Sequence, residues 1–207
     1  MNYLAHIYLA EPTPEAQLGA LLGDFKGAHC KPDRNSILNR EIVLHQLIDK
    51  FTDSHPAVLD AKSYFRPETR RFSGILLDIF FDHRLSCDWS KYCATELSLF
   101  IEQFYSDAQV LSNLFSPRFA EAFPKMVSEN WLGSYLEFEG VILAATRVSR
   151  RLTKSGELLR EGINDLEQNY APISACFDTF FPELVEYSQE QHHLVCHNSQ
   201  ALRDLGS

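Results

Sequence analysis

The stretch that decides the fold is "SGILLDIFFDHRL", residues 73–85, the most apolar run in the chain. It nevertheless contains two carboxylates and an imidazole, those of Asp78, Asp82 and His83. Residues four apart lie on one face of an α-helix, so Asp78 and Asp82 are expected side by side, with His83 near the same edge. Burying an ionised carboxylate without a partner costs several kcal/mol or more. We therefore expect a cation or a hydrogen-bond donor opposite this stripe.

The rest of the chain has the periodicity of helices. Its apolar residues recur at three- and four-residue intervals, several prolines stand where a first helical turn tolerates them, and Ser36 and Ser116 are candidate helix caps. The sequence predicts one all-α domain over residues 1–190 and a polar tail over residues 191–207. The helices are expected at about 2–10, 14–26, 36–52, 56–65, 67–87, 94–111, 117–128, 130–153 and 156–187.

Composition narrows the class of protein. A chain of 207 residues can bury a sizeable core. Its formal net charge of -9 disfavours nucleic acid as the main partner, because phosphate contacts need a basic surface. Five cysteines without framework spacing indicate reduced thiols, and no apolar run approaches the roughly 18 residues of a membrane span. We expect a soluble cytoplasmic protein whose oligomeric state is open.

A second polar stripe lies in "LHQLIDKFTDSHP", residues 44–56, where His45, Asp49 and Asp53 are spaced four and four. An imidazole and a carboxylate one turn apart can hold two sides of a divalent cation. His6 and Asp24 also interrupt apolar runs near the start. Each has a structural alternative: His6 as a core histidine, Asp24 as a turn residue, His45 with Asp49 as a local hydrogen bond, and Asp53 as a cap of the next helix.

Taken together, these residues favour a metal site, because four separate helices each present His or Asp from apolar surroundings. Oxygen-rich sites with imidazole suit Mn²⁺, Fe²⁺ or Mg²⁺ better than structural zinc, and we expect Mn²⁺ first. Helical bundles with inward His and Asp ligands are a known setting for metal-assisted hydrolysis. The candidate ligands are His6, Asp24, His45, Asp49, Asp78 and Asp82.

Basic residues precede the carboxylate helix in "YFRPETRRFSG", residues 64–74. Arginine binds phosphate through two parallel hydrogen bonds, so Arg70 and Arg71 are candidate phosphate ligands, with local Glu–Arg pairing as the alternative. The segment "HHLVCH", residues 192–197, has zinc-binding residue types. A solvated tail is the favoured interpretation of that segment, and we assign it no function.

Several motifs in one order resemble the acyl carrier protein phosphodiesterase family. They are "MNYLAHIYLA", "LLGDFKG", "LHQLIDKFTDSHP", "RPETRRFSGILLDIFFDHRLS" and "ENWLGSY", and the resemblance runs from Met1 to about Tyr187. It implies a helical fold distantly similar to HD-type metal-dependent phosphohydrolases, dependence on manganese, and removal of 4'-phosphopantetheine from holo acyl carrier protein to leave the apo protein.

The resemblance also implies roles for the residues already singled out. His and Asp ligands would hold one or two ions that activate water for attack on the phosphodiester. Arg70 and Arg71 would neutralise the phosphate oxygens, and His83 would protonate the leaving serine oxygen, with Asp53 as a second catalytic candidate. Two rivals remain: an HD-like phosphohydrolase acting on a small nucleotide or other phosphate ester, and a non-catalytic helical binding module.

The expected protein substrate imposes a condition on the surface. Acyl carrier proteins are acidic and this chain is acidic as well, so recognition needs a local basic patch. The candidates for that patch are Lys26, Lys31, Arg34, Arg66, Arg70 and Arg71.

Overall fold

The protein is all-α, as the sequence predicts. The computed structural model describes residues 1–25, 36–150, 152 and 156–204, with side chains as far as Val195, and these residues form no strand. None of the described helices is long and apolar enough to cross a bilayer. The α-helices are α1 (Tyr3–Leu9), α2 (Pro14–Leu22), α3 (Ile37–Ser54), α4 (Pro56–Ser63), α5 (Ser73–Cys87), α6 (Leu97–Val110), α7 (Pro117–Ser128), α8 (Trp131–Ser134), α9 (Phe138–Ser149), α10 (Gly156–Gln168) and α11 (Tyr170–Asp204).

Helix α5 lies at the centre of the molecule and contacts α1, α4, α9, α10 and α11. Its Phe80 and Phe81 are fully buried, and the Phe81 ring packs against Phe177 and Phe180 of α11. Apolar residues around nearly the whole helix explain this position, because such a helix must be covered on every side. The polar side chains within residues 73–85 therefore lie in the packed interior or at its edge.

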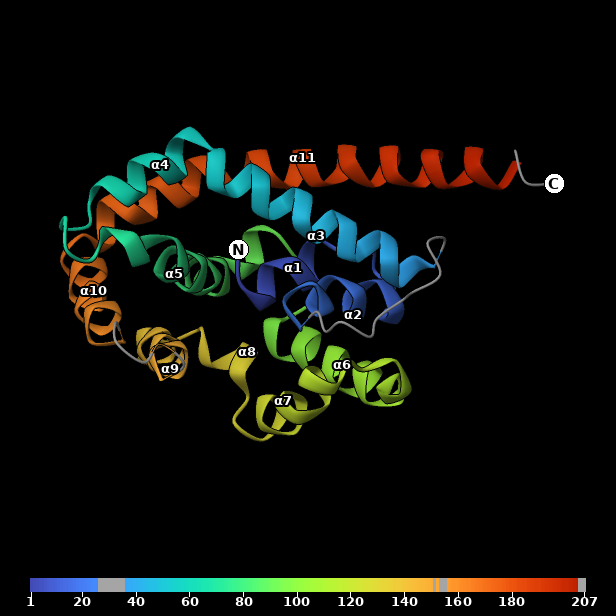
Figure 1. Cartoon of the computed structure of the whole chain (residues 1–207), viewed down its shortest axis with the longest axis horizontal. Coiled ribbons are helices and arrows are strands. Elements are labelled where there is room, and N and C mark those ends of the chain that lie inside the picture. The colour runs from blue at the N-terminus through green and yellow to red at the C-terminus, as the bar shows by residue number, and fades with distance from the viewer. Residues whose placement is uncertain (26–35, 151, 153–155, 205–207) are drawn as a thin grey trace.

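Among the helices that carry the other polar residues, α1 packs on α5, and α2 and α3 follow in sequence beyond it. Helix α11 runs along one side of the molecule, packs on α3 and α4, and ends at the C-terminus beyond them (Figure 1). Helix α2 packs on α3, and α1 lies against both α2 and α5 (Figure 1). The N-terminus of the chain thus lies in the middle of the fold, where α1, α3 and α5 approach one another.

Capping serines and first-turn prolines predicted several helix starts correctly. The Ser36 hydroxyl accepts a hydrogen bond from the Asn39 amide at the start of α3, and Ser116 does the same for the Phe119 amide at the start of α7. Both caps supply acceptors to amides that have no partner within the helix. Prolines open three helices at their first turn: Pro14, Pro56 and Pro117.

Two predicted helices differ from the observed ones in extent. The helix predicted over residues 67–87 begins at Ser73, after a 3₁₀ turn over Arg70–Phe72. The helix predicted over residues 130–153 is divided into α8 and α9, preceded by Asn130 with φ of 43°. Asparagine tolerates this left-handed conformation better than most residues.

The predicted helix over residues 156–187 is also divided, and its second part is longer than predicted. Helix α10 ends at Gln168, because Pro172 has no N–H to donate to the Gln168 carbonyl. Helix α11 then continues to Asp204. The boundary predicted at residue 190 between the domain and a polar tail therefore falls inside an uninterrupted helix.

Candidate metal centre

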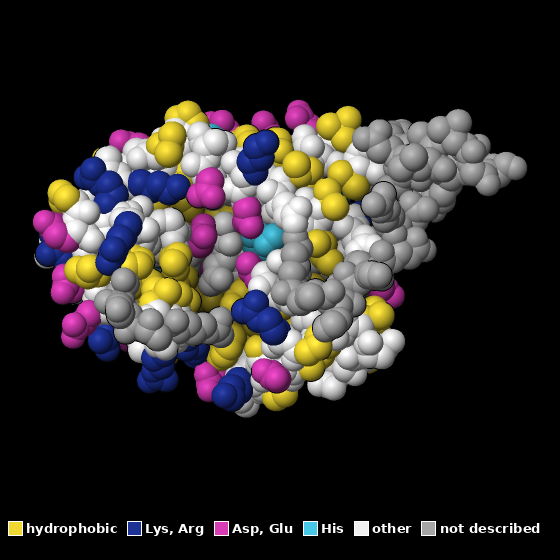
Figure 2. Space-filling view, viewed as in Figure 1, with side chains coloured by type: hydrophobic (Ala, Val, Ile, Leu, Met, Phe, Trp, Pro, Cys, Tyr) yellow, Lys and Arg dark blue, Asp and Glu magenta, His cyan; other side chains and the backbone are white. Residues whose placement is uncertain are grey.

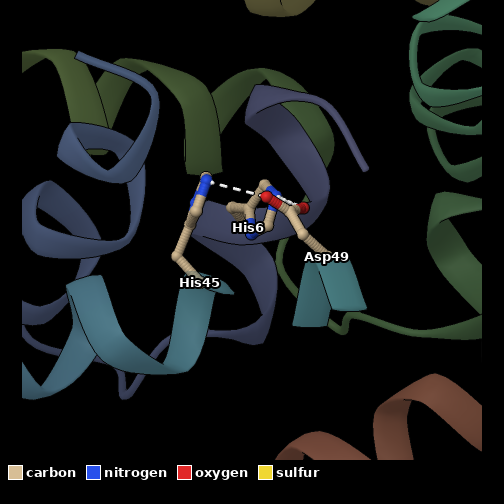
Figure 3. Close-up of side chains that lie close together, drawn as sticks. All are labelled: His6, His45 and Asp49. Carbon is tan, nitrogen blue, oxygen red and sulfur yellow. Dashed lines mark hydrogen bonds and ion pairs between the residues drawn. The ribbon is translucent and has the colours of Figure 1, made fainter. Parts of the chain in front are cut away.

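Three side chains from two helices form a compact cluster, which we call the His6 cluster: His6 of α1, and His45 and Asp49 of α3 (Figure 3). His6 Nε2 lies 3.1 Å from Asp49 Oδ1, and His45 Nε2 lies 3.2 Å from Asp49 Oδ2. The two imidazole rings stack with centroids 3.8 Å apart. One potential ligand atom from each residue lies within 4.8 Å of the others, which is the arrangement a single cation requires.

A hydrogen bond to a backbone carbonyl fixes the orientation of the His45 ring. Its Nδ1 donates to the Ala20 carbonyl oxygen at 2.8 Å, which leaves Nε2 as the atom that faces Asp49. A ring N–H donated to a backbone carbonyl is the usual support of a metal-binding histidine. Gly23 makes room for this ring, because a Cβ at that position would lie 2.3 Å from His45 Cγ. The end of α2 is therefore shaped around His45.

The two histidines have opposite protonation tendencies. Burial lowers the pKa of His6 to about 4, and the charge of His45 adds to the effect. Burial also lowers the pKa of His45, but its hydrogen bonds to Asp24 and Asp49 outweigh this and raise the pKa to about 9. The imidazole of His6 is thus neutral at pH 7, while His45 carries the positive charge that balances the carboxylates.

Asp24 stands at the edge of the His6 cluster, with Oδ1 3.6 Å from His45 Nε2. Burial raises the pKa of Asp24, but the hydrogen bond and charge of His45 outweigh this effect and hold the pKa below its ordinary value. The same histidine, together with His6, holds the pKa of Asp49 far below its ordinary value although the carboxylate is partly desolvated. Both acids are ionised at neutral pH, and their side chains are 39% and 41% exposed.

Asp78 faces a cation. The amino group of Met1 lies 2.9 Å from Asp78 Oδ1 and 3.6 Å from Asp49 Oδ1. Although burial opposes its charge, the two carboxylates raise the pKa of this amine to about 10. Asp78 and Asp49 therefore share a position at which positive charge is stabilised.

Asp82 has different partners, the backbone of α1. Its Oδ2 accepts from the Leu4 amide at 2.7 Å and its Oδ1 from the Ala5 amide at 3.2 Å. These amides belong to the first turn of α1, where the helix has no acceptors of its own. Burial raises the pKa of Asp82 to about 7, against the opposing effect of the two amides. The neighbouring carboxylates of α5 are thus matched with an amine and with a helix terminus.

The two predicted catalytic residues lie outside this cluster. His83 Nδ1 donates to the Tyr135 carbonyl at 2.8 Å, and its Nε2 lies 2.9 Å from the Tyr170 hydroxyl, which donates to it. Burial lowers the pKa of His83, so the ring is neutral and both of its nitrogens have partners. Asp53 is 74% exposed and pairs with Lys62 at 3.1 Å. Neither residue contacts a member of the His6 cluster through a described hydrogen bond.

The predicted phosphate ligands lie before α5. The Arg70 guanidinium donates to the Phe65 and Ser63 carbonyls at the end of α4, with distances of 3.0–3.3 Å. The Arg71 guanidinium lies 4.7 Å from the Phe72 ring centroid. Both arginines are exposed. The predicted basic residues Lys26, Lys31 and Arg34 lie outside the described residues.

Some contributors were missed at the level of sequence. The Met1 amine and the Ala20 carbonyl belong to the backbone, so no pattern of residue types predicts their part in the site. Gly23 could have been noticed only as a glycine beside Asp24. The stripe on α3 does have a detectable extension, because Glu41 precedes His45 by the same four residues that separate His45 from Asp49.

The donor set fits a divalent cation. Imidazole nitrogens and carboxylate oxygens without thiolate suit Mn²⁺, Fe²⁺ or Mg²⁺. His6 Nε2 lies 3.2 Å from the Met1 carbonyl and 3.1 Å from Asp49 Oδ1, whereas the buried Nδ1 has no hydrogen-bond partner among the described residues. The chain thus contains a group of residues that could hold a metal ion.

Comparison with known proteins identifies the family. A family model described as acyl carrier protein phosphodiesterase matches residues 1–184. Proteins named acyl carrier protein phosphodiesterase are similar over most of their length: one from Yersinia enterocolitica is 31% identical, covering 92% of this chain and 99% of the relative. One from Serratia proteamaculans is 33% identical with the same coverage.

No solved structure matches this chain, so the predicted similarity to the HD-type phosphohydrolase fold stays a prediction. The match over residues 1–184 agrees with the order of motifs in the sequence. The chain belongs to the acyl carrier protein phosphodiesterase family.

Proposed function

We propose that this protein is a metal-dependent phosphodiesterase that hydrolyses the bond joining 4'-phosphopantetheine to holo acyl carrier protein, giving the apo protein. The observation that carries the proposal is the His6 cluster, two imidazoles and a carboxylate converging at the surface of a chain of this family. Mn²⁺ is the first choice of cation and Fe²⁺ or Mg²⁺ the alternatives, on the chemistry of the donors.

The residues that would hold the cation are His6, His45 and Asp49, with Asp24 and Asp78 at the edge. A divalent cation in such a place supplies Lewis acidity, which lowers the pKa of water and balances charge on a phosphate. The chain's own residues prepare the place for it. Ala20 and Gly23 orient His45, and the amides of α1 bound to Asp82 fix the helix that carries His6.

The cluster is open on one side. Its imidazoles are buried, whereas the side chains of Asp24, Asp49 and Asp78 are 39–42% exposed. On the molecular surface, acidic side chains gather beside a histidine near the middle of one face, and lysine and arginine side chains flank them (Figure 2). A site that opens to the surface suits a phosphate carried at the end of an arm on another protein better than a nucleotide enclosed in a small pocket.

An acidic carrier protein needs basic side chains on the surface to which it docks. Arg66, Arg70 and Arg71 lie on the segment that leads into α5 and are exposed. Arg66 is already paired with the buried Asp165 at 2.6 Å, so its charge is partly balanced. Arg70 and Arg71 remain the proposed phosphate ligands, and His83 and Asp53 the proposed catalytic residues.

The test is a mass measurement of the substrate. Holo acyl carrier protein is incubated with the metal-stripped chain, with and without added Mn²⁺, and loss of the phosphopantetheine mass is followed. We expect conversion only with Mn²⁺, lost in Asp49→Asn and retained in the control Asp178→Asn, an exposed carboxylate of α11. Retained conversion in Asp49→Asn would remove the His6 cluster from the mechanism. No conversion by the metal-loaded protein would transfer the proposal to a smaller phosphate ester.

A further inference from the structure

A second set of metal-ligating residues lies one helical turn before His45 along α3. Glu11 of the α1–α2 connection, Glu41 of α3 and His192 of α11 bring one potential ligand atom each within 4.8 Å of the others. We call these three residues the Glu41 cluster. Glu41 and His45 are one turn apart on α3 and both lie against α2, but Glu41 also meets His192 of α11, whereas His45 meets His6 of α1. The two clusters are therefore built from different neighbours.

Glu41 is a buried acid whose hydrogen-bonding capacity is only partly satisfied by the described residues. Its side chain is 3% exposed, and within the described residues its Oε2 is a buried atom without a hydrogen-bond partner. Since an ionised carboxylate out of water needs a cation or a full set of donors, something is required opposite this group.

His192 is oriented to supply part of that requirement. Its Nε2 lies 2.9 Å from the Leu9 carbonyl, which can only accept, so this nitrogen carries the proton. The other ring nitrogen, Nδ1, faces Glu41 Oε1 at 3.5 Å. A proton or a cation between these two atoms stabilises the pair. A ring N–H donated to a backbone carbonyl is also how proteins orient a metal-binding imidazole.

The distance itself suits a cation. A zinc ion about 2.0–2.1 Å from a nitrogen and from an oxygen in tetrahedral geometry separates those two atoms by roughly 3.3 Å. The 3.5 Å between His192 Nδ1 and Glu41 Oε1 is close to this value and longer than a good hydrogen bond. The third ligand comes from Glu11, on a segment that reaches both other residues.

Solvent can reach the Glu41 cluster. A pocket of about 450 Å³ is lined by Glu11 and His192, together with Gln17, Ser188 and Gln189. Such a pocket provides a path for an ion and room for the water that completes its coordination.

We propose that Glu11, Glu41 and His192 form a second divalent-cation site, suited to Zn²⁺, that fastens α11 to α3 and to the α1–α2 connection. Two carboxylates and one imidazole make a three-residue site with one position left for water, a ligand set compatible with Zn²⁺. The site joins segments separated by about 150 residues in the sequence (41 and 192, a difference of 151). It is distinct from the His6 cluster and does not depend on the proposed activity.

The test is the number of Zn²⁺ ions retained by the full chain after equilibrium dialysis, measured by elemental analysis. Wild type is expected to hold one ion more than either His192→Gln or Glu41→Gln. The control His193→Gln, an exposed neighbour on α11, should hold as many as wild type. Asp49→Asn should keep the additional ion, which separates this site from the His6 cluster. Equal stoichiometry in wild type, His192→Gln and Glu41→Gln would show a proton-bridged pair and overturn the proposal.

A further variant guards against misfolding. Glu41 is buried, so its replacement could disturb α3, whereas Glu11 is only partly buried and lies outside any helix. Glu11→Gln should keep the circular dichroism of wild type and still lose the additional ion. Zn²⁺ should also raise the melting temperature of wild type more than that of Glu11→Gln, and equal shifts in the two proteins would count against the site.

Discussion

At the scale of single residues, the position of His45 depends on the absence of a side chain at Gly23. A Cβ there would lie 2.3–2.6 Å from three atoms of the His45 ring, and a ring held by Ala20 and Asp49 has little freedom to move aside. Gly23→Ala should therefore lower Mn²⁺ affinity or Mn²⁺-dependent activity about 10- to 100-fold, the usual effect of disturbing the support of a metal ligand.

The matched control for this change is Gly74→Ala in α5, where nothing lies within 4 Å of the added Cβ. It should keep full activity, because alanine is favoured over glycine within a helix. Titration calorimetry with Mn²⁺ and the mass assay provide the two readouts. Equal affinity and activity in the two variants would show that the orientation of His45 is unimportant.

The charge of His45 predicts a dependence of stability on pH in the metal-free protein. Its pKa rises from 6.5 in the unfolded chain to about 9 in the fold. The resulting contribution to stability is fully present below pH 6.5 and is lost as the pH rises towards 9. Urea unfolding between pH 6.5 and 9 should show a decline that is smaller in His45→Gln, and an identical decline in both proteins would contradict the assigned charge.

Residue types and spacing found the main elements of this site from sequence. The four-residue spacing of His45 and Asp49 and the isolated His6 predicted residues that do converge. The same reasoning grouped Asp78 and Asp82, which do lie on one helix. Asp78 faces the Met1 amine, however, and Asp82 accepts from two backbone amides of α1. Spacing predicts which side chains share a face, whereas their partners depend on packing between helices that no local pattern contains.

At the scale of elements, α1 depends on a cap from another helix. Its N-cap residue Asn2 makes no side-chain capping bond, and both Asp82 oxygens take that role for Leu4 and Ala5. Asp82→Asn replaces one of the acceptors by an amide donor facing a buried N–H. We expect a loss of about 1–3 kcal/mol in the free energy of unfolding.

The control is Asp53→Asn, since the Asp53 side chain is 74% exposed and pairs only with Lys62 among the described hydrogen bonds. An exposed pair of this kind contributes at most about 1 kcal/mol. Chemical denaturation of both variants gives the comparison. A destabilisation of Asp82→Asn no larger than that of Asp53→Asn would show that α1 does not need this cap.

The start or end of a helix was predictable where a capping residue or a proline marks it, and uncertain elsewhere. Ser36 and Ser116 announce α3 and α7 because a cap acts within a few residues. The division between α10 and α11 rests on Pro172, which the periodicity alone did not reveal, since the apolar spacing continues across it. The extension of α11 through a polar segment depends on packing against α3 and on intrinsic helix propensity, and composition suggested a loose tail.

At the scale of the whole molecule, the opposed carboxylates and imidazoles form a place prepared for a cation. Binding a ligand only to the folded state stabilises it by about 2.7 kcal/mol at a hundredfold excess over the dissociation constant. For a chain of this size that corresponds to a rise of roughly 5–10 °C in melting temperature. Mn²⁺ at this excess should produce such a rise in wild type at pH 7.5 and little or none in Asp49→Asn, and equal rises would place the ion elsewhere.

The overall class was predictable from sequence because it depends on periodicity summed over many residues. An all-α chain with one apolar central helix follows from the pattern around residues 73–85 and from the small number of period-two segments, and its acidity follows from the charge count. The arrangement of α1, α3 and α11 around that helix required the structure, because it is set by contacts between residues distant in the chain.

The measurement that tests the central claim most directly is anomalous diffraction from crystals of the full chain grown with Mn²⁺. We predict a manganese peak at bonding distance from His6, His45 and Asp49, absent from crystals of Asp49→Asn. Displacement of the Met1 amine from Asp49 would be compatible with that peak. A well-ordered His6 cluster without a peak, in crystals of protein that converts holo acyl carrier protein, would contradict the account.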